Sequence, residues 1–422
     1  MSEGFPEGWI KQKLGDLVKL QGGYAFQSSE FISKGVPIIR ILNISNGNVD
    51  LNRAVYYEPD ERLNSFLIKT GDVLIAMSGA TTGKIGLYNL RLDAYLNQRV
   101  GRFLIKDKEK INQIFLLQIL KTNQFYDRIV IDAIGGAQPN ISSLEIESQF
   151  VLIPPLPEQQ KIASILTSVD EVIEKTQSQI DKLQDLKKGT MDELLTKGID
   201  HTEFKDSEFG RIPKSWKTIV ISDLVNKSDR YSFSGGPFGS DLKSSDYTEN
   251  GIRILQLQNI GDGEFFNDYK IFTSLHKADE LLSCNIFPGE IILSKMGDPV
   301  ARAVIIPDYE DRYLMASDGI RLSVDKESYD VKFILEAINH PNFRYQAELH
   351  STGSTRKRIG LTELRKLTIN VPPFSEQKAI AYIFTIMDKN IEIIKHKLQK
   401  TQSLKKSLMQ DLLTGKVRVS VN

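Results

Sequence analysis

The chain contains one block of sequence twice. Residues 71–196 recur as residues 289–414 at a single constant offset, so that Gly-Asp-Val-Leu at 71–74 aligns with Gly-Glu-Ile-Ile at 289–292. In the same way, Pro-Pro-Leu-Pro-Glu-Gln at 154–159 aligns with Pro-Pro-Phe-Ser-Glu-Gln at 372–377. Solenoid repeats are only about 20–50 residues long, and a much longer period indicates a duplicated domain. We therefore expect two similar domains related by a pseudo-twofold axis, which suits a target that itself has two parts.

Upstream of these blocks the two copies drift out of register. Trp9 aligns with Trp216, and residues 35–44 align with residues 251–260, at smaller offsets. The second copy therefore carries insertions before Gly251.

Composition narrows the class of protein. At 422 residues the chain has room for about two to four domains, each with its own core. No apolar run approaches the roughly 20 residues of a membrane span, and the N-terminus lacks the basic and apolar regions of a signal peptide. The single cysteine, Cys284, excludes an intramolecular disulfide framework and fits a reducing cytosol. We expect a cytoplasmic protein without membrane contact.

Charge and histidine spacing exclude further classes. Lys and Arg together number 54, as do Asp and Glu, and this neutral balance argues against a simple basic nucleic-acid binder. The five histidines stand apart, with no spacing that would close a metal site. No catalytic Ser/His/Asp, Cys/His or paired-carboxylate pattern rises above chance.

Short apolar runs between glycines predict strands, and longer amphipathic runs predict helices. Residues 111–130 and 331–349 have helical periodicity, and each copy ends in a strand (150–155 and 367–373) whose double proline terminates it and starts a helix. The expected strands are 73–77, 84–88, 102–105, 290–293, 301–306 and 320–324. The fold class is therefore mixed α/β, with two globular α/β domains that are each followed by a long helix.

The two long helices, about 158–197 and 376–414, have coiled-coil spacing. Apolar residues recur at alternating steps of three and four, which is the seam of a helix pair. At 1.5 Å per residue, forty residues form a rod of about 60 Å. The segment 198–217 has the composition of a linker, so we expect antiparallel helices with the globular domains at opposite ends. The first helix is rich in acidic residues and the second in lysines, so the two can pair. The seam residues are Leu166, Val169, Ile173, Thr176, Ile180 and Leu183, and Phe384, Met387, Ile391, Ile394, Leu398, Thr401, Leu408 and Leu412.

These patterns predict the domain boundaries. The first globular domain covers residues 1–155 and the first long helix residues 156–198. A linker covers 199–212, the second globular domain 213–373, and the second helix with its tail 374–422.

The double prolines invite comparison with amino-methyltransferases, which carry a polar residue before Pro-Pro-aromatic at the active site. Here that position is Ile153 or Val371, and neither side chain can hydrogen-bond an amine. No glycine-rich turn that would hold a methyl donor follows a strand. We interpret the prolines as the boundary between strand and helix.

Two pairs of aligned loops are candidates for contact with a polyanion. The first is 78–84, aligned with 296–302, where glycines, hydroxyls and a cation suit phosphate; its candidates are Thr81, Thr82, Lys84 and Arg302. A tight hairpin with an incidental surface cation is the alternative.

The second pair of loops is 135–140, aligned with 353–358. Side-chain amides in the first copy align with cations in the second. Amides pair with adenine and arginine pairs with guanine in the major groove, although a solvated turn is the alternative. Its candidates are Gln138, Asn140, Arg356, Lys357 and Arg358.

A third region pairs glycines with an aromatic residue, at 22–27 and 234–240. It either brings a ring to a groove or is anchored by a buried phenylalanine. Its candidates are Tyr24, Phe26 and Gln27, and Lys243 and Lys295 of the second copy are further candidates for DNA contact.

In this order of elements, the chain resembles the specificity (S) subunit of type I restriction–modification enzymes over essentially its whole length. The most diagnostic segments are 153–163, 371–381, 71–74 and 289–292. It departs from the pattern in two places: Ser375 stands where the first copy has Pro157, and Met-Gly-Asp-Pro at 296–299 replaces the glycine–threonine loop.

The resemblance implies a DNA-reading subunit that is not itself catalytic. Each target recognition domain would read one half of a bipartite site, and the helix pair would set the spacing. Two methyltransferase (M) subunits carrying S-adenosylmethionine would clamp on the helices, and two restriction (R) subunits using ATP and Mg would join them. This chain would bind double-stranded DNA and hold no cofactor. The alternatives are a single-chain DNA methyltransferase and a coiled-coil scaffold for proteins.

Overall fold

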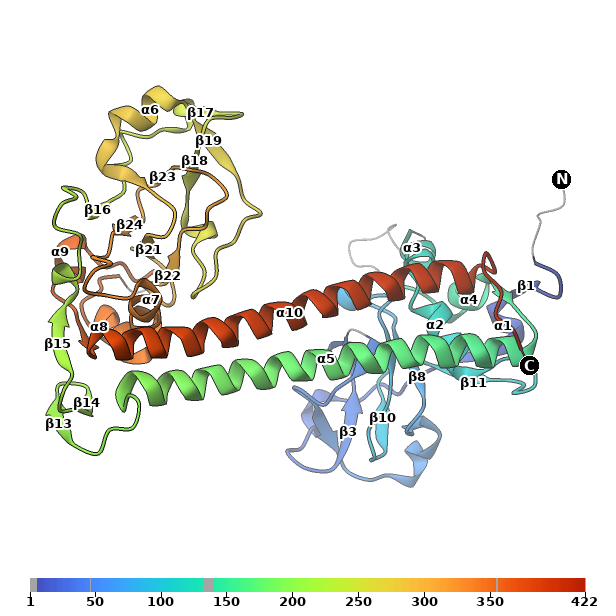
Figure 1. Ribbon diagram of the computed structural model, residues 1–422. Coiled ribbons are helices and arrows are strands. Elements are labelled where there is room, and N and C mark those ends of the chain that lie inside the picture. Colours follow the sequence, from blue (N-terminus) through green and yellow to red (C-terminus); the bar gives the residue numbers. More distant parts are fainter. Residues whose placement is uncertain (1–5, 46, 132–139, 354–355, 422) are drawn as a thin grey trace. The chain divides into compact units, whose positions relative to one another are not determined.

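The computed structural model describes residues 6–45, 47–131, 140–353 and 356–421. The chain divides into two compact units (Figure 1): unit 1 contains residues 1–177 and 396–422, and unit 2 contains residues 178–395. Two long helices, α5 (Leu156–Thr196) and α10 (Phe374–Leu413), each contribute one half to either unit. Within the described part of the chain, no helix is long and apolar enough to cross a membrane.

Unit 1 contains a sheet of order β2-β11-β8-β9-β5-β4, a sheet of order β6-β3-β10-β7 and the pair β1-β12. β3 and β10 are parallel, whereas β1 and β12 are antiparallel and join Ile10 to Ile153. The strands are β1 (Ile10–Lys13), β2 (Val18–Gly22), β3 (Val36–Ile39), β4 (Ile44–Ser45), β5 (Gly47–Val49), β6 (Val55–Tyr57), β7 (Leu67–Ile68), β8 (Val73–Ala76), β9 (Ile85–Leu87), β10 (Ala94–Leu96), β11 (Val100–Ile105) and β12 (Phe150–Ile153).

Unit 2 repeats this topology. Its sheets have the orders β16-β24-β21-β22 and β17-β19-β18-β23-β20, with the pairs β15-β25 and β13-β14. β18 and β23 are parallel, as are their counterparts β3 and β10. The strands are β13 (Phe204–Ser207), β14 (Gly210–Pro213), β15 (Lys217–Val220), β16 (Phe233–Gly235), β17 (Tyr247–Thr248), β18 (Ile252–Leu255), β19 (Ile271–Thr273), β20 (Asn285–Ile286), β21 (Ile291–Ser294), β22 (Ala303–Ile305), β23 (Tyr313–Met315), β24 (Gly319–Leu322) and β25 (Thr368–Val371).

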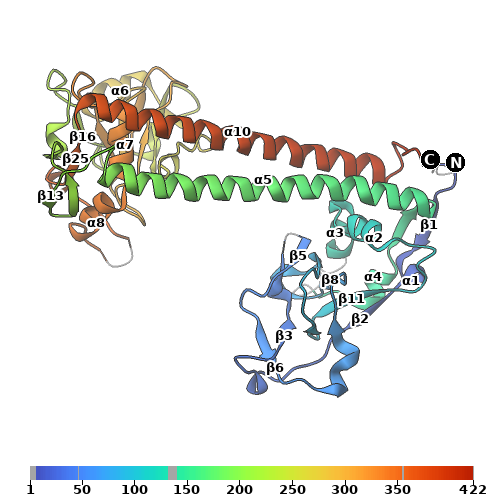
Figure 2. The ribbon, with the colours of Figure 1, turned by 60° about the horizontal axis from the view of Figure 1, so that its bottom comes forward.

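Short helices connect the sheets of each unit to the long helices. In unit 1, α2 lies beside the N-terminal half of α5 (Figure 2), and Phe115 of α2 shares one buried cluster with Leu166 of α5 and Leu412 of α10. In unit 2, Phe333 of α7 is buried together with Leu195 and Phe384 of the long helices. The short helices are α1 (Leu14–Leu17), α2 (Gln113–Leu120), α3 (Asn123–Ile131), α4 (Ser143–Glu147), α6 (Leu275–Glu280), α7 (Val331–Asn339), α8 (Pro341–Leu349) and α9 (Leu361–Leu364).

Two expectations about local structure were wrong. The helix expected over 331–349 is two helices, because Pro341 lacks an N–H and begins α8, where the His340 ring accepts a hydrogen bond from the Asn342 N–H (3.2 Å). The helix expected over 111–130 is also two, because the Thr122 hydroxyl caps α3 and accepts from the Phe125 N–H (3.2 Å). The segment interpreted as a linker contains the antiparallel hairpin β13-β14.

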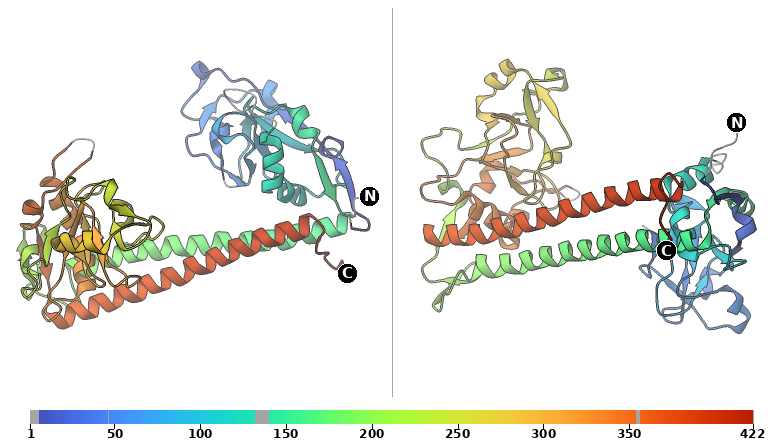
Figure 3. Two further views of the ribbon diagram at one scale, coloured as in Figure 1. Left: turned by 90° about the horizontal axis from the view of Figure 1, so that it is seen from above. Right: turned by 45° about the vertical axis from the view of Figure 1, so that its right-hand side comes forward.

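The long helices pack against each other in antiparallel fashion, as the heptad spacing and the connecting segment predict (Figure 3). In unit 1, Lys405 of α10 pairs with Asp170 of α5 (2.5 Å), and in unit 2, Lys187 of α5 pairs with Asp388 of α10 (2.6 Å). The two aspartates occupy one position of the repeat and the two lysines another, so the helices exchange equivalent ion pairs. Every predicted seam residue is buried or half-buried. The expected α/β fold class with a helix pair is confirmed.

The Pro-Pro-x-x-Glu-Gln segment joins each long helix to its sheet. The side-chain amide of Gln159 donates to the Pro154 carbonyl (2.9 Å), and that of Gln377 donates to the Pro372 carbonyl (3.0 Å). Their oxygens accept from the first turns of the short helices, at the Asn112 N–H (2.8 Å) and the Asp330 N–H (2.9 Å). These glutamines therefore hold two helix starts together.

Of the preceding glutamates, Glu158 is buried and Glu376 is half-buried. Both accept hydrogen bonds from groups elsewhere in the same unit. Glu158 accepts from the Trp9 indole (3.2 Å) and from two nitrogens of Arg418 (2.7 and 2.8 Å). Glu376 accepts from the Trp216 indole (3.2 Å). It also accepts from the Ile199 N–H (3.1 Å) and lies 2.9 Å from the His201 Nε2. Arg418 follows the C-terminal end of α10 in unit 1, and Ile199 and His201 follow that of α5 in unit 2.

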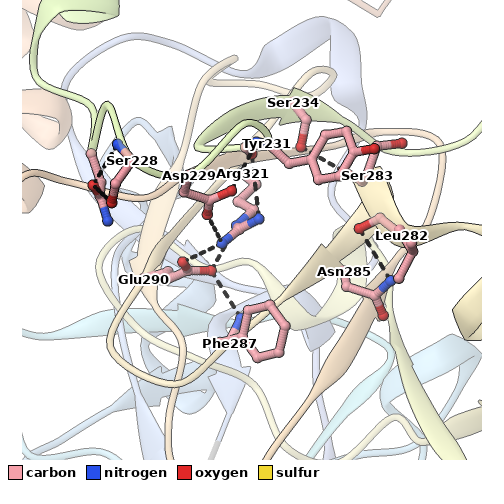
Figure 4. Close-up of polar contacts among 11 residues, drawn as sticks. Ser228, Asp229, Tyr231, Ser234, Leu282, Ser283, Asn285, Phe287, Glu290 and Arg321 are labelled. Carbon is pink, nitrogen blue, oxygen red and sulfur yellow. Dashed lines mark hydrogen bonds and ion pairs between the residues drawn. The ribbon is translucent and has the colours of Figure 1, made fainter.

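The acid of the Gly-Asp/Glu motif has a structural role (Figure 4). Glu290 accepts from Nε and Nη2 of the buried Arg321 (2.8 and 2.6 Å) and from the Phe287 N–H (2.9 Å). Asp229 accepts from the same guanidinium (2.6 Å). In unit 1, Asp72 likewise pairs with Arg102 (3.1 Å). The motif therefore fixes a sheet arginine in both copies.

A cluster of four charged side chains joins α5, α7 and α10 in unit 2. Lys332 contacts Glu336 (2.6 Å) and Asp388 (2.5 Å), and Lys187 contacts the same two carboxylates. Burial alone would raise the pKa of Asp388, but Lys332 and Lys187 outweigh it and lower that pKa. Burial would lower the pKa of Lys332, but the two carboxylates raise it. The four charges therefore stabilise each other.

We expect Asp388→Ala to lower the stability of the chain by about 1–3 kcal/mol, because two half-buried lysines would lose an acceptor. Thermal unfolding followed by circular dichroism measures the change, with the exposed Asp308→Ala as the control variant. Because the folded pKa of Asp388 is lowered, its contribution is fully present above the ordinary aspartate pKa of about 3.9. It is lost as the pH falls through the lower folded value. Equal melting temperatures of wild type and Asp388→Ala at pH 7 would contradict this account.

Candidate nucleic-acid interface

The candidate loops of unit 1 meet at one edge of the sheets. Ser78 forms a β-bridge with Asn140, and the Met77 N–H donates to the Arg99 carbonyl (2.9 Å). The Tyr24 N–H donates to the Leu96 carbonyl (2.8 Å) at the start of the same turn. The segments around Tyr24 and Met77 therefore both contact residues 96–99, and the segment at Asn140 joins them through Ser78. Gln138 lies outside the described residues.

Unit 2 forms the same edge from its aligned segments. Met296 bridges to Arg358, and the Lys295 N–H donates to the Asp318 carbonyl (2.7 Å). The Gly236 N–H donates to the Gly319 carbonyl (2.8 Å). The described residues of loops that the sequence treats as three separate candidates thus lie at one edge in each unit.

Two glycines allow the third loop to lie against this edge. A Cβ on Gly23 would be 2.2 Å from the Leu96 carbonyl oxygen, and a Cβ on Gly236 would be 1.8 Å from that of Ala316. Any other residue would push the loop away. The glycines therefore explain why aromatic residues beside them reach the edge.

Within unit 1, the predicted residues differ in their exposure. Tyr24 is 40% exposed and packs edge-on against Phe26, which is half-buried beside Tyr57 and Tyr95. Phe26 is therefore an anchor of the loop, as the alternative interpretation has it, and Tyr24 and Gln27 are the surface residues.

The threonines of the first loop support its backbone. Thr82 is buried and donates to the Gly79 carbonyl (2.6 Å), whereas the half-buried Thr81 donates to the Ile41 carbonyl (3.1 Å). Because each hydroxyl has a single hydrogen to donate, neither threonine is a phosphate donor in this conformation. DNA contact by Thr82 therefore stays a prediction, and in this conformation its hydroxyl hydrogen is used within the loop. Lys84 is exposed.

The cations of unit 2 also differ in their surroundings. Lys243 is exposed, whereas Arg302 is half-buried, although it aligns with Lys84. The Arg302 Nε is buried and has no hydrogen-bond partner among the described residues. Lys295 is half-buried and donates to the Ser317 carbonyl (3.2 Å). Burial, and then the nearby Arg358, lower the pKa of Lys295.

The basic loop of unit 2 contains one exposed cation without an ion pair among the described residues and two cations in ion pairs. Arg356 is exposed, and no ion-pair partner for it occurs in the described ranges. Lys357 pairs with Glu348 (3.1 Å), and Arg358 pairs with Asp318 (3.0 Å) while its side chain remains 51% exposed. The structure therefore brings Lys295 and Arg358 together and leaves Lys243 in a separate segment.

The aromatic residue of the third loop in unit 2, Phe238, is 82% exposed, as the interpretation of that loop as a surface for a groove requires. Sequence reasoning missed Asp318 at the same edge. No sequence signal marks Asp318, because it is placed by its contact with Arg358, which is distant in the sequence.

The described residues contain no group of three His, Cys, Asp or Glu side chains placed to hold a metal ion. The two edges offer hydrogen-bonding groups, cations and exposed rings. Asn140 and Arg358 occupy matching positions in the two units, so the edges share a backbone and differ in chemistry.

Comparison with known proteins identifies relatives of this chain. Residues 6–185 and 213–402 match the family model of the type I restriction modification DNA specificity domain. The chain is 30% identical to the putative type I restriction enzyme MjaX specificity subunit of Methanocaldococcus jannaschii, over 98% of this chain and 95% of that protein. It is 26% identical to the MjaVIII specificity subunit of the same organism, over 98% and 94%.

Solved structures share the fold. The S subunit of a type I restriction-modification system from M. genitalium superposes with a TM-score of 0.60 at 15% identity, over 98% of this chain and 97% of that one. The expected resemblance is confirmed: the chain belongs to the type I restriction–modification DNA specificity family.

Proposed function

We propose that this chain reads an asymmetric, bipartite DNA site, with the edge of each unit reading one half. The observation that carries the proposal is the matched pair Asn140 and Arg358, which project from equivalent β-bridges. Amides pair with adenine and arginine pairs with guanine in the major groove. Two different half-sites need different side chains at equivalent positions of the two units, and Asn140 and Arg358 meet this condition.

Other exposed groups would supply contacts that do not depend on sequence. Lys84 and Arg356 are cations at these edges, and each phosphate that a cation neutralises releases counterions. Tyr24 and Phe238 offer rings for apolar contact with bases. In this proposal residues 1–155 and 213–373 read DNA, in the cytoplasm where the host DNA lies.

The helices would dock the catalytic partners. Several large apolar side chains on α5 and α10 are exposed although the seam between the helices is already filled, and such patches mark interaction sites. They are Val172, Leu186, Tyr382, Ile386, Ile393 and Leu404. We assign residues 156–198 and 374–422, with the connector 199–212, to the docking of partner subunits. The partners would be two methyltransferase subunits, which hold S-adenosylmethionine, and two restriction subunits, which use ATP and Mg. This chain itself would hold no cofactor and be non-catalytic. A structural neighbour described in terms of complex assembly of the type I R-M system supports this assignment.

A single-chain methyltransferase is disfavoured by where the double prolines lie. Ile153 and Val371, which precede them, are buried and paired within strands β12 and β25. Neither side chain can bind the amine of a base. A coiled-coil scaffold that only binds proteins would not explain why the two units carry equivalent loops with different side chains.

The first experiment measures cofactor binding and DNA methylation. Isothermal titration of the purified chain with S-adenosylmethionine should give no binding. Co-expression with its methyltransferase partner should give methylation of one asymmetric two-part sequence, detected by sequencing for modified bases. Methylation by the chain alone would support the single-chain enzyme instead, and an assembled complex without any sequence preference would support the scaffold.

The second experiment separates the two edges. Arg356→Ala with Arg358→Ala should reduce discrimination at one half-site only, by roughly 5- to 150-fold for each base that the variant no longer reads. Lys84→Ala in unit 1 is the matched variant. Because Lys84 is assigned to phosphate, its removal should weaken binding equally for all sequences and reduce the salt slope by about one. The readout is competition binding of the assembled complex to DNA altered in either half, and equal loss of discrimination at both halves would contradict modular reading.

A further inference from the structure

Arg358 is fixed at its backbone from two sides. Its N–H donates to the Thr352 carbonyl and its carbonyl accepts from the Thr352 N–H, both at 2.9 Å. On the other side it forms a β-bridge with Met296, and the next residue, Ile359, donates to the Lys295 carbonyl (2.9 Å). The guanidinium therefore projects from a point that the sheet edge holds in place.

Asp318 holds the other end of this side chain. Its carboxylate accepts from the Arg358 Nη2 (3.0 Å), and among the described residues it is the acceptor found for that guanidinium. Asp318 is itself held, because its carbonyl accepts from the Lys295 N–H (2.7 Å). One N–H of the five on the arginine is used in this contact, and the side chain stays half-exposed. Enough donors remain for a bidentate contact with another group.

The fold itself does not require an acid at this place. In unit 1 the equivalent carbonyl, which accepts from the Met77 N–H, belongs to the exposed Arg99. A carboxylate on a surface that meets phosphates also opposes binding, because like charges repel. The acid is therefore a feature of unit 2, where its carboxylate contacts Arg358.

We propose that Asp318 is a positioning residue that orients Arg358 toward one guanine of the half-site read by unit 2. With Nη2 tied to Asp318, the free N–H groups form a fork that matches O6 and N7 of guanine in the major groove. Lysine at position 358 would lack this fork. This inference rests on the proposed function. It adds that the base read by Arg358 is a guanine and that Asp318 holds the arginine in place.

The test is Asp318→Asn in the complex assembled with the methyltransferase partner, measured by competition with DNA substituted at each base pair of the second half-site. Discrimination should fall roughly 5- to 150-fold at one guanine-containing pair. Binding to non-specific DNA should stay equal or rise, because a negative charge near phosphate is removed. Arg358→Ala should lose discrimination at the same pair, and the double variant should lose no more than Arg358→Ala. The exposed Asp308→Asn is the control and should change nothing.

Arg358→Lys is the second variant, which keeps the charge and the reach to Asp318. It should also lose discrimination at that pair. Unchanged discrimination in Asp318→Asn or in Arg358→Lys overturns the proposal, as does an additive loss in the double variant. A fall in non-specific binding together with an equal loss at every base pair also overturns it, because it indicates a merely structural role. Failure of the proposed function looks different: the wild-type complex would prefer no sequence at all.

Discussion

A carboxylate at the start of each long helix, buried at Glu158 and half-buried at Glu376, organises its unit of this molecule. Glu158 and Glu376 are each surrounded by donors from their own unit: an indole, and a group that follows the end of the opposite helix. A buried carboxylate without partners is costly, so all of these segments must be in place together. The helix start, the first strand pair and the chain beyond the other helix are thereby fixed to one another, and the sheets that carry the loop edges follow from that frame.

Duplication keeps this frame constant while the loop edges vary. The motif acid still pairs with a sheet arginine in both copies (Asp72 with Arg102, Glu290 with Arg321), and the glycines beneath the third loop still meet a carbonyl. At the edge itself, Asn140 in one copy corresponds to Arg358 in the other. The segments that identify the family are therefore structural, and the residues assigned to reading DNA are the ones in which the copies differ.

The sequence predicts those features that depend on local periodicity or on repetition. Heptad spacing gave both long helices and their buried seams, and the aligned copies gave the loops that meet at each edge. It missed the break at Pro341 because the apolar period continues through it, and it missed the hairpin at 204–213 because short polar strands look like linkers. The sequence could not show that Phe26 is half-buried and Thr82 buried, nor that Asp318 is the partner of Arg358, because each depends on contacts with distant segments.

Amide hydrogen exchange of Glu376→Ala tests most directly whether the carboxylate at the helix start holds its unit together. Removing it leaves the Trp216 indole and the Ile199 N–H without an acceptor. The account predicts faster exchange at residues 199–201 and in β15, with no change in β1 of unit 1, and the reverse pattern for Glu158→Ala. Unchanged exchange in both units, or equal acceleration in both, would contradict it.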